Sequence, residues 1–269
     1  MTKKVDLVIA RYKENLDWLK KYSDRKFNKI YVYNKGKTDV VCPLKPESGD
    51  VIYVKLPNVG RCDHTYIHHI IDKYDNLGDV TLFIKGSIIC KGRTFSNREV
   101  TKFEISLKKA FETGDSAFTG KRFPPDISQT MGSFSIASHM TGCGDNINTN
   151  TKFKLFPANP RPFSEWYKVR FPDIVGEDRV CFAGIFAVSK KHIHFRKKEG
   201  YQPFLDELAV DSNPEAGHFL ERSWFALFQN ANHKIPDSCF DSSTEWQGGR
   251  YTRKMLKKVG GLKRRNKTY

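Results

Sequence analysis

Residues 80–86 read VTLFIKG, a short run of apolar side chains that ends in Lys85 and Gly86. The run has strand length and contains almost no polar side chains. This pattern is typical of a strand covered on both faces, as in a parallel sheet. We therefore expect this stretch to be a central strand of a parallel sheet.

Three further apolar runs of strand length precede it, at residues 5–12, 29–36 and 50–58. Apolar side chains at helical spacing predict helices at 14–23, 61–77, 100–114, 201–211 and 213–230. Pro214 suits the first turn of the last helix, and Asn213 can cap it. Residues 179–195 predict a strand, a turn and the start of another strand or helix. Alternation of strands and helices predicts an α/β fold with a mainly parallel sheet.

Residues 119–178 have a different composition, rich in Gly, Pro, Ser, Asn and Thr. They contain few periodic apolar runs and predict long functional loops within a single domain. Asp126 and Asp145 lie in these loops and are possible contacts for an acceptor or a metal. We divide the chain into a domain at 1–245 and a basic C-terminal segment at 246–269.

The chain has 46 basic and 30 acidic residues, a net charge of +16. Nine of the basic residues, and no acidic residue, lie at 250–269, which leaves 37 and 30, or +7, for the rest. Such a charge predicts an anionic partner: a nucleic acid, an acidic membrane or a phosphorylated small molecule.

Processing signals and the spacing of the cysteines indicate the cellular compartment in which the protein works. No run of about 18 apolar residues predicts a transmembrane helix, and the first residues lack the apolar region of a signal peptide. The six cysteines are scattered without a Cys-x-x-Cys pair. This usage predicts reduced thiols in a cytosolic compartment rather than a disulfide scaffold or a zinc ribbon.

The run NVGRxxHTYxHHII at residues 58–71 is the most specific motif of the chain. Together with other segments of residues 5–230, it resembles an uncharacterised domain family of fungi, plants, algae and large DNA viruses. That family is known only as a domain of unknown function, and a viral member would work in the host cytoplasm.

A remoter resemblance implies an activity. The segment GIFAVSKKHI at 184–193, followed by Glu221-Arg222-Ser223-Trp224, is similar in order and spacing to the core-2 N-acetylglucosaminyltransferase and peptide xylosyltransferase families. The resemblance implies a GT-A-like (Rossmann-like) fold and a glycosyltransferase that transfers a sugar with inversion. It also implies a nucleotide-sugar donor, such as a UDP- or GDP-sugar, and a glycan or glycoprotein acceptor.

An inverting transfer needs a carboxylate that takes the proton of the acceptor hydroxyl. By the remoter resemblance Glu221 aligns with this base. The alternative is a solvated glutamate paired with Arg222 or Arg250. His218 lies one helical turn before Glu221 and is expected to orient it. Glu215 is the second candidate base, although its place in the first helical turn suits capping equally well.

The leaving diphosphate needs positive charge. Metal-dependent GT-A enzymes carry an Asp-x-Asp motif after the fourth strand, where this chain has Lys85-Gly86-Ser87. This departure favours a version that needs no cofactor besides the donor, although a divalent metal stays open. Lys85 and the tail residues would then neutralise the phosphates. The tail residues that share one helical face are Arg250, Arg253, Lys254 and Lys257.

Other donor contacts are expected where strands end. Arg11 follows the first strand, and Tyr12 beside it can stack on a base. Asn58, Gly60 and Arg61 form a turn at the start of a helix, where backbone N–H groups suit phosphate oxygens. We expect part of the basic tail to pack near Arg11 and Arg61; the alternative is a disordered tail.

Histidines offer weaker signals. His64 and His68 are four residues apart and face the same way on a helix, but no third ligand has a recognisable spacing. Packing or hydrogen bonding is the favoured role for them, and also for His192 and His194. Two other functions stay open: a nucleic-acid-binding protein that uses the tail with Tyr251 and Tyr269, and a catalytically inactive scaffold.

Overall fold

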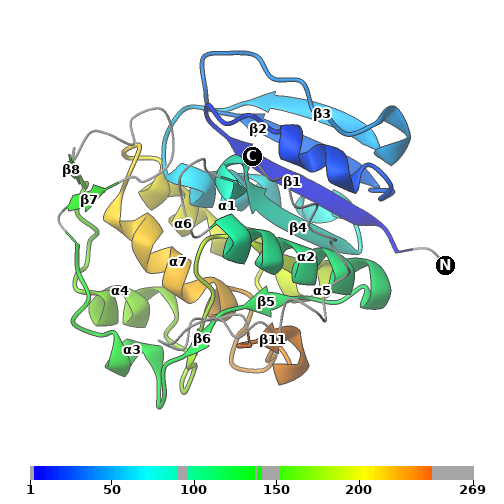
Figure 1. Cartoon of the computed structure of the whole chain (residues 1–269). Helices are drawn as coiled ribbons and strands as arrows, with labels where there is room; N and C mark the ends of the chain where they lie inside the picture. Colours follow the sequence, from blue (N-terminus) through cyan, green and yellow to red (C-terminus); the bar gives the residue numbers. More distant parts are fainter. Residues whose placement is uncertain (1–2, 90–95, 137, 141–151, 244–269) are drawn as a thin grey trace, which may run out of the picture.

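The computed structural model describes residues 3–89, 96–136, 138–140 and 152–243. Its centre is a five-stranded sheet in the order β10-β4-β1-β2-β3 (Figure 1). Four strands are parallel: β1 (Val5–Arg11), β2 (Lys29–Asn34), β3 (Asp50–Lys55) and β4 (Val80–Lys85). The fifth, β10 (Phe186–Ser189), runs antiparallel to β4. The expected α/β class and mainly parallel sheet are confirmed.

The VTLFIKG stretch forms β4, an interior strand between β10 and β1, as its apolar run predicted, and β1 is the middle strand of the five. All seven residues of β1 are buried. Leu7 and Ile9 belong to the hydrophobic cluster on one face of the sheet, and Val8 and Ala10 to the cluster on the other. Because both faces are covered, β1 and β4 carry equally apolar runs, and the run alone did not distinguish their positions.

Helices cover both faces of the sheet (Figure 1). The cluster of Val8 and Phe83 is closed by α1 (Arg61–Lys73), α6 (Gln202–Leu208) and α7 (Glu215–Leu227). The opposite cluster is closed by α2 (Ser96–Thr113) and the short 3-10 helix η1 (Asp17–Tyr22). Among the described residues, no helix is both long and apolar enough to cross a membrane.

The remaining elements are short. The helices are η2 (Pro46–Ser48), η3 (Tyr74–Asn76), η4 (Gly86–Ile88), α3 (Ile127–Thr130), α4 (Phe163–Arg170), α5 (Lys190–Ile193), η5 (Lys198–Tyr201) and η6 (Asp237–Cys239). The strands are β5 (Phe118–Thr119), β6 (Lys121–Arg122), β7 (Ser138–Met140), β8 (Lys152–Lys154), β9 (Arg179–Val180) and β11 (Phe240–Asp241). Several of them interrupt the region that was expected to be loops.

The cap predicted for α7 is wrong. The residue before the helix is Pro214, in an extended conformation, and no side chain caps the end. The first N–H of the helix, that of Glu215, donates instead to the Phe156 carbonyl at 2.8 Å. The side-chain amide of Asn213 is buried, and neither its oxygen nor its nitrogen has a hydrogen-bond partner among the described residues.

Candidate functional site

The candidate site lies at the carboxyl ends of the parallel strands. From β1 the chain proceeds outward to β2 and β3 and then returns to place β4 on the other side of β1. In open α/β sheets, ligands bind in the crevice where the strand order reverses in this way. The segments that follow these strands begin at Tyr12, Lys35, Leu56 and Gly86.

Three residues singled out in the sequence come together at this edge. Arg61 begins α1, and its Nη1 lies 3.2 Å from Nε2 and 3.3 Å from Nδ1 of His218 on α7. One turn further along α7, the Oε1 of Glu221 accepts a hydrogen bond from the Ala183 N–H at 2.9 Å. Ala183 precedes β10, which is antiparallel to β4, so it lies at the carboxyl end of β4. His218 therefore contacts the guanidinium of Arg61, which links it to Glu221 electrostatically.

The charge of Arg61 acts on two carboxyl groups, those of Glu221 and Asp63. Burial acts to raise the pKa of Glu221, but Arg61, the Ala183 N–H, Lys85 and Arg222 together bring it below its ordinary value. Burial, with a smaller contribution from the charge of Glu221, raises the pKa of Asp63 to about 7 against the opposing effect of Arg61. The environment thus separates the two pKa values and leaves Glu221 ionised at neutral pH.

Asp63 and Cys62 were not predicted as site residues. Asp63 is 3% exposed, and its Oδ1 has no hydrogen-bond partner among the described residues. Its Oδ2 accepts a long contact of 3.9 Å from the Cys62 thiol. Burial raises the pKa of this thiol to about 12, so Cys62 is a neutral neighbour and not a thiolate. The sequence gives no signal for Asp63, because an acid in a first helical turn is ordinary.

Lys35 was also missed, and it holds the turn that carries Arg61. It follows β2, is buried, and donates from Nζ to the carbonyls of Val59, at 2.5 Å, and of Arg61. Burial lowers the pKa of Lys35 to about 8. The position of Arg61 therefore depends on a lysine that lies on the neighbouring strand connection.

Gly60 fits the close approach of two segments at the start of α1. Its φ is +55°, and a Cβ placed there would lie 2.5 Å from the carbonyl oxygen of Leu208 and 2.6 Å from the Cβ of His64. No side chain caps this end of α1. Because α1 follows β3, its N-terminus lies at the carboxyl edge of the sheet, and helix N-termini favour anions.

The other predicted donor contacts are more scattered. Arg11 is buried, and its Nη1 donates to the Asn34 side chain at 2.9 Å and to the Thr38 carbonyl at 2.8 Å. These bonds fix the loop after β2 and use much of its donor capacity. Tyr12 is 40% exposed, and Asn58 is exposed as well.

Lys85 forms an ion pair with Glu99 on α2, with 2.8 Å between Nζ and Oε1, and its charge also acts on Glu221. Arg222 does not form an ion pair with Glu221, the pair that the alternative role of Glu221 as a solvated glutamate included. Its guanidinium lies 3.7 Å from the ring centre of Phe134 and donates to the His218 carbonyl. The predicted positions in the tail, Arg250, Arg253, Lys254 and Lys257, lie outside the described residues, as does Asp145.

Glu215, the second candidate base, is fully buried. Its Oε1 accepts from the Ile136 N–H at 2.7 Å and from Arg161 at 3.1 Å, while Oε2 accepts from the Ala158 N–H at 2.9 Å. Since both oxygens are occupied, Glu215 anchors two loops to α7 and has no oxygen left for an acceptor. It is also not the helix cap that its position suggested.

Asp126 has a structural position too, because it caps α3. Its Oδ1 accepts from the Ser128 N–H at 2.6 Å, and its Oδ2 accepts from the Gly176 N–H at 2.7 Å. This carboxylate therefore binds backbone donors on two loops. It is not directed at the cluster around Arg61.

The histidines have structural partners. His64 and His68 stack with 6.1 Å between ring centres, His192 is 2.6 Å from the Ser116 hydroxyl, and His194 is 2.9 Å from the Tyr74 carbonyl. In the part of the chain that the structure describes, no three His, Cys, Asp or Glu side chains are grouped to hold a metal ion.

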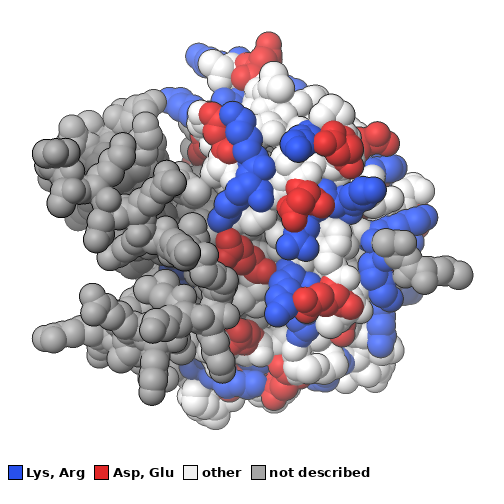
Figure 2. Space-filling view, turned by 45° about the vertical axis from the view of Figure 1, so that its right-hand side comes forward, with Lys and Arg blue, Asp and Glu red and all other residues white. Residues whose placement is uncertain are grey.

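Charges on the described surface are mixed. In the view of Figure 2, lysines and arginines are interspersed with aspartates and glutamates and do not form a field of one sign. A nucleic-acid surface needs clustered positive charge. On this face, the described residues do not offer such a cluster.

A comparison with family models gives one match, described as "Protein of unknown function (DUF3431)", over residues 7–241. It covers nearly all of the described chain, including both helices of the site. A search of curated proteins gives no match. The expectation of an uncharacterised family is confirmed.

Proposed function

The chain belongs to this family, whose description names no activity, and from its site we propose that the protein is an inverting glycosyltransferase. It transfers a sugar from a nucleotide-sugar donor to a hydroxyl acceptor of a glycan. The observation that carries the proposal is the ionised carboxylate of Glu221, held beside Arg61 at the switch point of an α/β sheet. The remoter likeness of the GIFAVSKKHI and ERSW segments to GT-A enzymes supports the same function.

Glu221 is suited to the role of base. Its Oε1 is fixed by the Ala183 N–H, whereas its Oε2 accepts no hydrogen bond from the described residues. In the proposed step, Oε2 of Glu221 takes the proton of the acceptor hydroxyl. At the same time the hydroxyl oxygen of the acceptor forms a bond to the anomeric carbon of the donor sugar. The bond from this carbon to the diphosphate breaks, and its electron pair leaves with the diphosphate.

Positive charge next to the carboxylate serves the leaving group. Arg61, Lys85 and the uncapped N-terminus of α1 lie on the same edge of the sheet. They would offset the negative charge that develops on the diphosphate without a metal ion. The first-turn N–H groups contribute a directed field, and the two side chains contribute full charges.

The test is transfer or donor hydrolysis by the purified full-length chain over a panel of UDP- and GDP-sugars. Glu221→Gln keeps the hydrogen bond from Ala183 but cannot take a proton, so we expect activity to fall about 100-fold or more. Glu165→Gln is the matched control, since Glu165 lies on α4 in an exposed pair with Lys168. Undiminished transfer by Glu221→Gln contradicts the assignment of the base. Absence of binding of every nucleotide sugar in calorimetry contradicts the enzyme class.

A further inference from the structure

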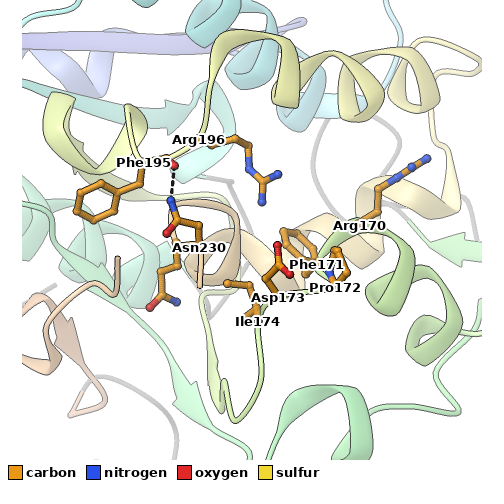
Figure 3. Close-up of a pocket in the computed structure, with 9 residues that line it drawn as sticks. Arg170, Phe171, Pro172, Asp173, Ile174, Phe195, Arg196 and Asn230 are labelled. Carbon is orange, nitrogen blue, oxygen red and sulfur yellow. Dashed lines mark hydrogen bonds between the residues drawn. The ribbon is translucent and has the colours of Figure 1, made fainter. Parts of the chain in front are cut away.

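A cavity of about 250 Å³ lies at the end of α7 away from Arg61 (Figure 3). Its walls come from residues 170–174 after α4, 195–196 after α5 and 229–230 after α7. The chain reaches 195–196 from the end of β10 that pairs with the amino end of β4. The cavity is therefore separate from the site around Glu221.

Arg196 provides a cation to this cavity. Its Nε donates to the Leu227 carbonyl at 3.1 Å, and its guanidinium lies 5.6 Å and 5.5 Å from the ring centres of Phe171 and Phe204. The two terminal nitrogens have no acceptor among the described residues. Figure 3 shows the guanidinium pointing into the space between Asn230 and Asp173. Burial lowers the pKa of Arg196, which reflects the cost of a desolvated cation.

The charged neighbours of Arg196 do not neutralise it directly. Asp173 attracts it electrostatically, but the two form no ion pair, and the Asp173 carboxylate has no hydrogen-bond partner among the described residues. The other arginine of the lining, Arg170, is already bound to Glu207 at 3.0 Å and 3.2 Å. The cavity therefore contains one cation and one anion that face it without bonding to each other.

Both charges together restrict the ligand. A ligand with only a negative charge would bind Arg196 but would be repelled by Asp173. A ligand with only a positive charge would bind Asp173 but would be repelled by Arg196. A molecule with one charge of each sign satisfies both. Phe171, Pro172 and Ile174 line the cavity with apolar surface, and its volume lies just below the range of about 300–1,000 Å³ typical of ligand pockets. These features favour a small zwitterion with an apolar side chain.

We propose that this cavity binds a free α-amino acid, with its carboxylate on Arg196, its ammonium group on Asp173 and its side chain against Phe171 and Ile174. The carboxylate accepts from the two terminal nitrogens of the guanidinium, in the bidentate geometry that arginine offers.

The experiment uses the full-length chain, with thermal shift over the proteinogenic amino acids followed by calorimetry on those that stabilise it. We expect at least one apolar amino acid to bind. Its N-acetyl derivative, which lacks the ammonium charge, and its methyl ester, which lacks the carboxylate, should each bind about tenfold more weakly or worse. Absence of binding by every amino acid overturns the proposal, and so does equal binding of the N-acetyl derivative.

Two variants locate the ligand. Asp173→Asn and Arg196→Gln are each expected to weaken binding about tenfold or more, because each removes a hydrogen bond between charged groups. Arg196 also bonds to α7, so its replacement costs stability. Asp173 lies on an exposed loop, and its variant decides the question even if Arg196→Gln does not fold. Asp24→Asn, at another exposed carboxylate, is the control and should bind as the unmodified chain does. Unchanged affinity in Asp173→Asn contradicts the proposed site.

Discussion

At the scale of single residues, Asp63 and Glu221 lie on different helices, and the charge of Arg61 acts on both. The sequence was sufficient to single out Arg61, His218 and Glu221. Arg61 begins a predicted helix, Glu221 lies in the ERSW segment, and His218 lies one helical turn before it. It was not sufficient for Asp63, Cys62 or Lys35. Their importance comes from burial, which depends on how α1 meets α7 and on how the loop after β2 turns.

The raised pKa of Asp63 predicts a dependence of stability on pH. Burial raises the pKa from 3.8 to about 7 on folding, so the folded state binds a proton that the unfolded state releases between these values. The contribution of Asp63 to stability is therefore fully present at low pH and is lost as pH rises through 7. Asn cannot ionise, so we expect Asp63→Asn to gain stability relative to the unmodified chain between pH 5 and pH 8, on the order of 1–3 kcal/mol.

Urea unfolding of both proteins at the two pH values measures this difference. Asp24→Asn is the control, since Asp24 is exposed and should follow the unmodified chain at both. If Asp63→Asn and the unmodified chain change in parallel with pH, the carboxyl does not take up a proton on folding.

Glu215 predicts a large loss of stability that involves no chemistry. Glu215→Ala leaves two backbone N–H groups and the partly exposed Arg161 without their acceptor, and each lost hydrogen bond to a charged group costs about 1.5–3 kcal/mol. Glu165→Ala removes an exposed pair on α4 and should cost about 0.5 kcal/mol or less. Chemical denaturation measures both free energies of unfolding. Equal losses would show that the bonds of Glu215 contribute little.

At the scale of elements, helical spacing predicted α1, α2, α6 and α7, but it failed in two places. The segment at 14–23 forms only the 3-10 helix η1, although Leu19 and Tyr22 pack as expected. The region 119–178 contains α4, whose buried Phe163, Trp166 and Tyr167 have helical spacing. The apolar spacing of α4 was present in the sequence. The helix is only eight residues long, and the prolines and polar residues around it made the whole region look like loops.

The start of α1 predicts a steric effect that a matched pair of glycines can isolate. Gly60→Ala puts a Cβ 2.5 Å from the Leu208 carbonyl oxygen at a φ of +55°, so backbone must shift. Gly176 has a similar φ of +71°, but nothing lies within 4 Å of its Cβ position. Gly176→Ala should cost only the left-handed backbone strain, about 1–2 kcal/mol.

Gly60→Ala should cost more than Gly176→Ala and should also displace Arg61. Thermal unfolding compares the two variants, and nucleotide-sugar binding reports the position of Arg61. The same melting temperature for both variants would contradict the close contact between α1 and α6.

At the scale of the whole molecule, alternating strands and helices were sufficient to predict the class and the parallel sheet. They did not predict that Val5–Arg11 would be the middle strand of the five. Val5–Arg11 and Val80–Lys85 are both apolar runs with two covered faces, and they differ in which strands pair with them. Pairing partners are long-range contacts, and a local pattern does not contain them.

Deletion of residues 244–269 is expected to leave the fold intact. The two hydrophobic clusters of the described residues lie between Val5 and Phe240, and the family match ends at 241. The truncated chain should therefore unfold cooperatively, with a melting temperature close to that of the full chain. If the tail supplies charge to the diphosphate, the same truncation weakens nucleotide-sugar binding. Loss of cooperative unfolding would show that the tail is part of the folded core.

Because α7 closes the face of the sheet that contains Phe83, the order of synthesis has a consequence for the nascent chain. The four parallel strands leave the ribosome long before α7 does, and Tyr66, which packs against Phe83, then has no Trp224 to pack against. An apolar sheet face stays open to chaperones until α7 emerges. The carboxylate of Glu221 is part of α7, so the proposed site around Arg61 and Glu221 is completed in the same step that covers the core.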